Sequence, residues 1–159
     1  MDLHEKFREK KEALLADLRK SITYTPDREH DLYTMMQQYL NAEPEDREPI
    51  LRNILCCGSG QPYPDPRAGD YAYTEADIQK VGATIDRYLD RLPGCGGDDA
   101  AIRQALADAV REINVLEEAT EHGLIDTWRR EELCGILNGA AEQAGTEPQE
   151  DMTFSLRMW

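Results

Sequence analysis

The most regular stretch of the chain is DDAAIRQALADAVREINVLEEATEHG, residues 98–123. Its apolar side chains recur at intervals of four, three, four and three residues, which is the spacing of one face of an α-helix. These positions are Ile102, Leu106, Ala109, Ile113 and Leu116. Gly123 can end such a helix, because glycine readily takes the left-handed backbone conformation of a C-terminal cap. The stretch therefore predicts a helix whose apolar face packs into a core.

Similar periodicity on both sides of this stretch predicts further helices. Apolar spacing and capping residues place them over residues 2–20, from Thr25 to Leu40, from Pro44 or Glu45 to about Cys56, from Thr74 to Leu92, and over residues 126–144. Residues 58–73 are rich in glycine, proline and tyrosine, and their alternate prolines exclude a helix. We expect an all-α fold, a single domain over residues 1–159 with five or six helices and a long loop at 58–73.

The C-terminal residues 151–159 follow a different period. Met152, Phe154, Leu156 and Met158 alternate with Thr153, Ser155, Arg157 and Trp159. Strict alternation over eight residues is typical of a β-strand, so we predict a short C-terminal strand or extended arm. A lone strand leaves its backbone groups unpaired, and the candidate partners are residues 22–25, another protein, or a second copy in a homodimer. The alternative is a frayed chain end.

Composition and cysteine spacing indicate a compact chain in a reducing compartment. The chain has 159 residues, 40% of them hydrophobic, which is enough for one core. Its apolar runs are too short for a membrane span, and residues 1–6 contain no apolar segment of a secretion signal. The four cysteines, Cys56, Cys57, Cys95 and Cys134, lack the C-x-x-C spacing of zinc sites. We therefore expect free thiols and a cytoplasmic location.

The formal net charge is −14, and it is unevenly distributed. Residues 1–60 contain 9 Lys+Arg and 12 Asp+Glu, whereas residues 61–159 contain 9 and 20. This charge argues against nucleic acids and anionic membranes as partners, because both are bound through Lys and Arg. A basic protein surface is the complementary partner, and solubility alone is the competing explanation.

Catalytic motifs are absent from the sequence. It contains no phosphate-binding G-x-x-x-x-G-K-[ST] loop, no dinucleotide-binding G-x-G-x-x-G and no zinc-binding H-E-x-x-H. Glu118, Glu121 and His122 lie close together in the sequence, with Asp126 just beyond, and could form a metal or acid/base cluster. Solvated acids at a helix end explain this grouping more simply. We predict no catalytic residue, no metal and no cofactor; the alternative is a small metal-binding or thiol-dependent helical enzyme.

The remaining features indicate a binding function. The loop that contains alternate prolines presents Tyr63, Tyr71 and Tyr73 beside Asp65 and Asp70. Tyrosines on a stiff loop lose little entropy on binding, which suits them to interfaces; alternatively, they pin the loop to the helices. The acidic helices that follow complete the predicted partner-binding set with Asp77, Glu117 and Glu118.

We therefore predict a non-catalytic, acidic protein-binding protein, an inhibitor or adaptor that covers a basic partner surface. In size and charge the chain resembles small acidic immunity proteins that neutralise bacterial toxins. In that class, acidic helices cover a basic active site; the likeness is one of general character, without a shared motif. A homo-oligomeric structural or adaptor protein paired through residues 151–159 is the third possibility.

Overall fold

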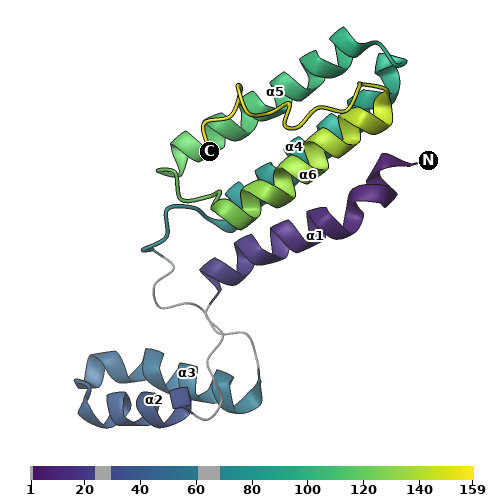
Figure 1. Cartoon of the computed structure of the whole chain (residues 1–159). Coiled ribbons are helices and arrows are strands. Elements are labelled where there is room, and N and C mark those ends of the chain that lie inside the picture. The colour runs from purple at the N-terminus through teal and green to yellow at the C-terminus, as the bar shows by residue number, and fades with distance from the viewer. Residues whose placement is uncertain (1, 24–29, 61–68) are drawn as a thin grey trace. The chain divides into compact units, whose positions relative to one another are not determined.

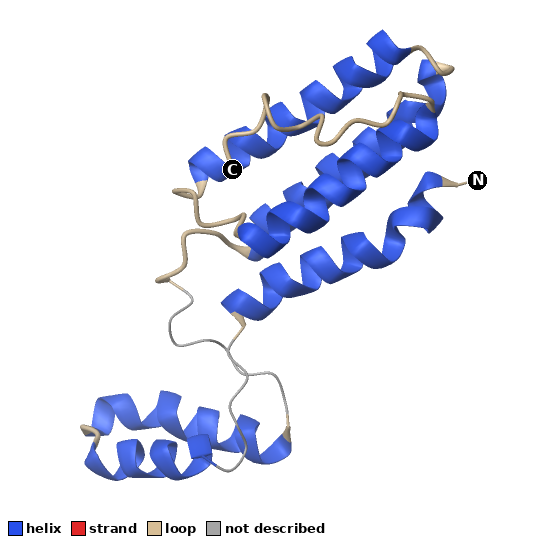
Figure 2. Cartoon of the chain, viewed as in Figure 1, coloured by secondary structure: helices blue, strands red, loops and turns tan. Residues whose placement is uncertain are grey.

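The computed structural model describes residues 2–23, 30–60 and 69–159. These residues form six α-helices and two short 3-10 helices, and no β-strand occurs among them (Figures 1 and 2). In chain order the elements are α1 (Leu3–Ile22), α2 (His30–Asn41), η1 (Pro44–Asp46), α3 (Arg47–Ser59), α4 (Glu75–Arg91), η2 (Leu92–Cys95), α5 (Asp99–Ala119) and α6 (Thr127–Ala144). The prediction of an all-α fold is confirmed.

The chain groups into two compact units. Unit 1 comprises Met1–Arg19 and Ala72–Trp159, and unit 2 comprises Lys20–Tyr71. Unit 1 therefore contains most of α1 together with α4, η2, α5 and α6, and unit 2 contains α2, η1 and α3. The single domain predicted over residues 1–159 stays a prediction.

Unit 1 is a helical bundle with an aliphatic core (Figure 1). Every one of its four α-helices contributes side chains that are at most 1% exposed; they include Leu14, Leu18, Ile78, Ile85, Leu89, Ile102, Leu106, Ile113, Leu133 and Ile136. The helix predicted at residues 98–123 is thus a core helix, as its spacing indicated. Close packing also needs Gly139 in α6, because a Cβ atom there would meet the Phe7 ring at 3.1 Å.

The start of each later helix of unit 1 is fixed by a side chain. The Asp77 carboxylate accepts hydrogen bonds from the backbone N–H (3.0 Å) and the hydroxyl (3.2 Å) of Thr74 at the start of α4. Asp98 accepts from Ala100 N at the start of α5 (3.0 Å), and Asp126 accepts from Arg129 N at the start of α6 (2.8 Å). These bonds satisfy backbone donors that have no partner within the helix.

The end of α5 differs from the prediction. The helix ends at Ala119, and the residues with positive φ are Glu121 (52°) and His122 (59°), not Gly123. His122 N donates to Glu117 O (2.8 Å), so the turn is closed before Gly123 is reached. Gly123 is needed for space instead, because a Cβ atom there would lie 3.0 Å from Cβ of Ala72.

The strand predicted at residues 151–159 is wrong, because local hydrogen bonds fold this segment into turns. The Asp151 carboxylate accepts from the backbone N–H (2.9 Å) and the hydroxyl (2.6 Å) of Thr153. Leu156 N and Arg157 N both donate to Thr153 O, at 2.9 and 3.0 Å. These bonds occupy backbone groups that a strand would offer to a partner.

The C-terminal segment instead lies along α5 of unit 1 (Figure 1). Asn114 Nδ2 donates to Leu156 O (2.9 Å), and Met158 N donates to Asn114 Oδ1 (2.9 Å). Of the candidate strand partners at residues 22–25, Ile22 is the last residue of α1, and Tyr24 and Thr25 lie outside the described residues. No strand is therefore available for pairing in the described residues, and a homodimer through residues 151–159 stays a prediction.

Unit 2 consists of α2 and α3, which lie side by side and are joined through η1 (Figure 1). Pro44 starts η1 and Pro49 lies in the first turn of α3, where a missing N–H costs no helix bond. Gly60 ends α3 with φ of 70°. The capping residues predicted for α2, Thr25 to Asp27, lie outside the described residues. We call this pair of helices, residues 30–59, the hairpin.

The lengths and compositions of the described helices show whether any of them could cross a membrane. In the described part of the chain, none of the helices combines the length and the hydrophobicity needed to span a lipid bilayer.

Candidate protein-binding surfaces

The eight residues predicted to contact a partner fall into different environments. Tyr63 and Asp65 lie outside the described residues. In unit 2, Asp70 is exposed and Tyr71 is half-buried. The other four belong to unit 1, where Tyr73 is 5% and Glu117 is 2% exposed, Asp77 is half-buried and Glu118 is exposed. Among the described members of this set, only Asp70 and Glu118 are therefore exposed acidic residues.

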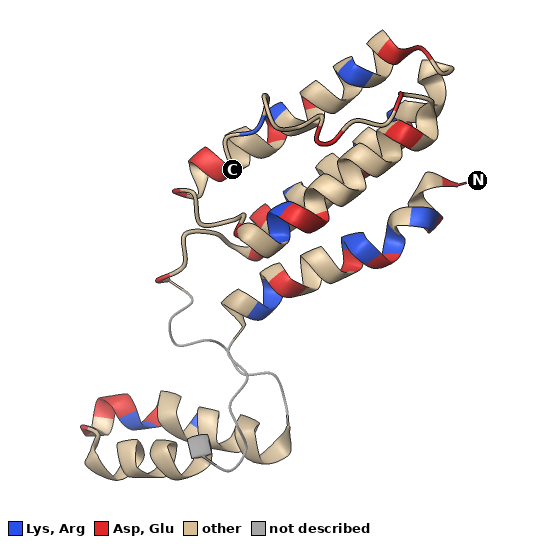
Figure 3. Ribbon diagram, in the orientation of Figure 1, with Lys and Arg blue, Asp and Glu red and all other residues tan. Residues whose placement is uncertain are grey.

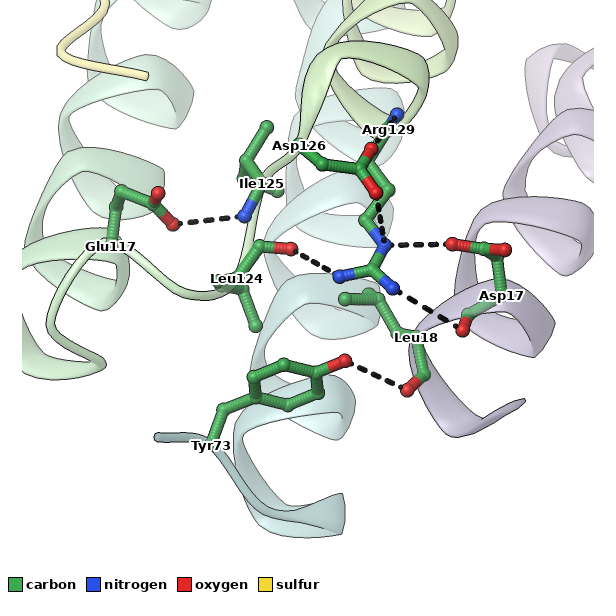
Figure 4. A network of polar contacts seen from close by, with 8 residues as sticks. All are labelled: Asp17, Leu18, Tyr73, Glu117, Leu124, Ile125, Asp126 and Arg129. Carbon is green, nitrogen blue, oxygen red and sulfur yellow. Dashed lines mark hydrogen bonds and ion pairs between the residues drawn. The ribbon is translucent and has the colours of Figure 1, made fainter. Parts of the chain in front are cut away.

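Tyr73 belongs to a buried polar network around Arg129 (Figure 4). Arg129 is only 5% exposed, and its Nε donates to Asp17 Oδ2 at 2.7 Å. Its terminal nitrogens donate to Leu124 O (3.1 Å) and Asp17 O (3.5 Å). The Tyr73 hydroxyl donates to Leu18 O (3.0 Å), and the Tyr73 ring centroid lies 5.9 Å from the guanidinium. Tyr73 thus fastens the end of the loop to α1, which is the alternative role of these tyrosines.

Burial and hydrogen bonding act in opposite directions on the pKa of Arg129. Burial alone would lower this pKa, because it penalises the charged form. The hydrogen bond to Asp17 and the nearby acidic groups outweigh burial and raise the pKa. The guanidinium therefore stays positively charged. Its ion pair with Asp17 joins α6 to α1 (Figure 4).

Glu117 also serves the interior of unit 1. One carboxylate oxygen accepts a hydrogen bond from Ile125 N (3.1 Å) in the connection between α5 and α6. Burial raises the pKa of Glu117, and the backbone hydrogen bonds from Ile125 and Leu124 counteract only part of this effect. Glu117 therefore orders the α5–α6 connection, whereas its neighbour Glu118 is exposed to solvent.

The ion pairs of unit 1 leave an excess of unpaired carboxylates. Acidic residues lie along its helices and its C-terminal segment (Figure 3). Within the described residues of unit 1, every lysine and arginine except Lys6 and Arg130 forms an ion pair with a carboxylate of the same unit. The exposed acids of this unit that form no ion pair with a described residue include Asp2, Glu9, Glu12, Glu118, Glu121, Glu131, Glu147 and Glu150. The surface field of unit 1 is consequently negative.

The hairpin carries a second kind of surface, which the sequence reasoning missed. Its exposed large apolar side chains are Tyr33 (68%), Met36 (50%), Leu40 (67%), Leu51 (43%) and Leu55 (64%). We call these five residues the hairpin face. A signal was present in the sequence, because six of the nine residues from Leu32 to Leu40 are apolar or aromatic and occupy more than one helix face.

One groove of unit 1, with a volume of about 420 Å³, lies between α4 and α5 and has a charged lining. Four of its five charged residues pair across it, Arg87 with Glu112 and Arg91 with Asp108, and the fifth, Asp90, contacts His4 Nε2 at 2.8 Å. Among the described residues, no group of three or more His, Cys, Asp and Glu is arranged to hold a metal ion.

The cysteines are free thiols and do not form an evident nucleophilic centre. Cys56, Cys57, Cys95 and Cys134 are all unbonded to one another. Burial raises the pKa of the Cys134 thiol, and its contact with the Thr153 hydroxyl (3.3 Å) counteracts only part of that rise. The less nucleophilic, protonated form is therefore favoured at this position.

The candidate surfaces have to be interpreted without a relative of known function. Comparison of the chain with protein-family models, with curated proteins and with solved structures found no match.

Proposed function

We propose that this chain is a non-catalytic, acidic protein-binding protein that covers a basic surface of its partner, in the manner of an inhibitor or adaptor. The observation that carries the proposal is the ion-pair pattern of unit 1. Nearly all of its described cations are neutralised within the unit, while many exposed carboxylates have no cation. Such a surface attracts Arg- and Lys-rich proteins and accelerates their association.

The end of α5 is the part of unit 1 that we propose as a contact region. Glu118 and Glu121 are both exposed there and form no ion pair with a described residue. Their charges add to the negative end of the helix dipole, because the last carbonyl groups of a helix point in this direction. Asp70 is a further exposed acid of the predicted set, and it belongs to unit 2.

A capture experiment with nuclease-treated extract of the source cell tests the proposal. The immobilised full chain should retain basic proteins at about 50 mM salt and release them at about 500 mM, since screening shortens the range of charge interactions. Glu118→Gln combined with Glu121→Gln should lower the retained amount several-fold. Retained proteins that are neutral or acidic, or retention that ignores salt, would contradict the proposal.

The matched control for this variant is Glu43→Gln combined with Glu45→Gln in unit 2. Both side chains are exposed, and the substitution changes the net charge by the same amount. We expect this control to retain the partner almost as well as the unsubstituted chain. An equal loss with both variants would mean that total charge, and not the end of α5, determines binding. The four free thiols support a cytoplasmic setting for this activity.

A further inference from the structure

The hairpin buries very little of its own apolar surface. Among its described side chains, only Met35 (6% exposed) and Cys57 (5%) are buried large or sulfur-containing apolar residues. A pair of short helices has too little interior to be stable without further contacts. Helical hairpins usually gain the missing core by packing against other helices, as in four-helix bundles.

The hairpin face lies on one side of the two helices. In α2, Leu32, Met35 and Tyr39 form the inner stripe towards α3, and Tyr33, Met36 and Leu40 repeat the same spacing about 100° further around the helix. In α3, the inner stripe includes Ile54. Leu51 and Leu55 lie one residue after positions of that stripe, so they too are about 100° further around their helix. Because the two helices of a hairpin run in opposite directions, equal displacements bring both outer stripes to the same side.

The charges of the hairpin lie mostly outside the hairpin face. In α2 and α3, Asp31 and Glu48 are balanced by Arg47 and Arg52, and the net charge of −3 of residues 30–59 comes from the acids of the connection, Glu43, Glu45 and Asp46. Glu48 and Arg52 follow the outer stripe of α3 around the helix and form an ion pair (2.9 Å). The hairpin face is therefore an apolar centre rich in Tyr, Met and Leu, with polar groups beside it, as in protein interfaces.

We propose that the hairpin face docks against the hairpin face of a second copy of this chain, which completes a symmetric four-helix arrangement. A copy of the same chain has a net charge of −14, so two copies repel one another least where they meet through residues without charge. The hairpin face consists of five uncharged residues, and a basic partner would gain no electrostatic attraction from them. The exposed fractions of these five residues correspond to roughly 600 Å² in each copy, so a symmetric pair covers at most about 1,200 Å² of them, which is the lower limit for specific interfaces.

Sedimentation or light scattering of the full chain as a function of concentration tests this proposal. The mass should rise from 18.1 kDa towards twice that value as the concentration increases to about 100 µM, and added salt should not weaken the association, because it screens the repulsion between the two acidic chains. Leu40→Glu combined with Leu55→Glu should raise the dimer dissociation constant at least tenfold, because carboxylates would meet in the apolar centre. Both residues are exposed and glutamate is a good helix former, so the circular dichroism spectrum should show the same helix content.

The matched control is Phe154→Glu combined with Met158→Glu in unit 1. These residues are 72% and 64% exposed, and the variant adds the same charge, yet it should leave the dimer intact. Dissociation by the control variant and not by the hairpin variant would overturn the proposal, as would an unsubstituted chain that stays monomeric over the whole concentration range.

A cross-linking measurement decides the case without any charged substitution. Benzoylphenylalanine in place of Tyr33, in a mixture of ¹⁴N- and ¹⁵N-labelled chains, should give mixed-label products that join two hairpins. Products confined to one chain, or products that join position 33 to unit 1, would show that the hairpin face has a different occupant and would overturn the proposal.

Discussion

Unit 1 and the hairpin of unit 2 are both made of amphipathic helices, but they differ in how much of their apolar surface is buried. In unit 1, leucine and isoleucine side chains from four helices are at most 1% exposed. In the hairpin, five large apolar side chains are 43–68% exposed. The comparison shows that an apolar helix face indicates burial only where enough helices are present to cover it; elsewhere it indicates a surface that needs a partner.

The largest expected contrast between the two regions concerns leucine truncation. Leu133→Ala in α6 should lower the free energy of unfolding by about 3 kcal/mol, because this side chain is fully buried and its loss leaves a cavity. Leu55→Ala in α3 should cost less than about 0.5 kcal/mol in dilute, monomeric chain, since Leu55 is 64% exposed. Urea unfolding followed by tryptophan fluorescence reports on unit 1, which contains both Trp128 and Trp159, and circular dichroism reports on all helices.

If Leu55→Ala lowers the free energy of unfolding as much as Leu133→Ala does in dilute solution, the hairpin face must be covered within the single chain, and the contrast between the two regions is wrong. A cost that appears only at high protein concentration would instead support a hairpin face that is covered by a second copy.

Arginine substitutions should show the next largest contrast. Arg129→Met should destabilise unit 1 by about 2 kcal/mol, since it leaves Leu124 O without its donor and Asp17 without its buried cation. Arg52→Met in the hairpin should cost about 0.3–0.5 kcal/mol, because its ion pair with Glu48 is exposed. Thermal or urea unfolding of the two variants measures both values. Equal effects would show that the network in Figure 4 contributes no more than a surface pair.

Alanine substitutions of two glycines should change stability in opposite directions. Gly145 ends α6 with φ of 119°, and a Cβ atom there would lie 3.3 Å from Cα of Gly97, so Gly145→Ala should cost about 1 kcal/mol or more. Gly58 lies in α3, and a Cβ atom there would have no neighbour within 4 Å, so Gly58→Ala should stabilise the hairpin by about 0.5 kcal/mol. Tryptophan fluorescence should detect the first change, and circular dichroism the second. A stabilising Gly145→Ala would contradict the assigned backbone conformation.

The smallest expected effect is the pH dependence caused by Glu117. Burial raises its pKa in the folded state, so the folded chain binds this proton more tightly than the unfolded chain. The contribution of Glu117 to stability therefore declines as the pH rises from its ordinary pKa through the raised value. Glu117→Gln removes this decline and keeps an oxygen that can accept from Ile125 N. The free energy of unfolding of the variant, minus that of the unsubstituted chain, should therefore become more positive between about pH 4 and about pH 8, by less than about 1 kcal/mol.

A stability difference that stays constant over that range would show that the Glu117 carboxylate is not affected by its burial.

Most of the helices could be predicted from the sequence, because their signals are local. The spacing of Ile102, Leu106 and Ile113 and the caps at Thr74 and Asp126 depend only on neighbouring residues. The strand predicted at residues 151–159 was wrong because alternation describes side chains, whereas Asp151 and Thr153 determine the path of the backbone through their hydrogen bonds. Period-two alternation without a pairing partner in the sequence is weak support for a strand.

The candidate surfaces were harder to predict, because exposure depends on contacts that are distant in sequence. Tyr73 and Glu117 have the residue types of partner-binding positions, yet they contact Leu18 and Ile125 inside unit 1. Conversely, Tyr33, Leu40 and Leu55 have the residue types of a core, yet they are exposed. Residue type and period identify an amphipathic face, but the number of helices available to cover it decides its role.

The chain order of the two units has a consequence for folding. The chain leaves unit 1 at Arg19 and returns to it at Ala72, so residues 20–71 form one long excursion between α1 and the rest of the bundle. Bringing the ends of a chain segment together costs conformational entropy that grows by about 0.6 kcal/mol for each doubling of its length. The helices α4, α5 and α6 are consecutive, and their short connections carry a smaller cost, so they can assemble early through contacts that are short in sequence. We therefore expect the first helix of the sequence, α1, to be the last to join its bundle.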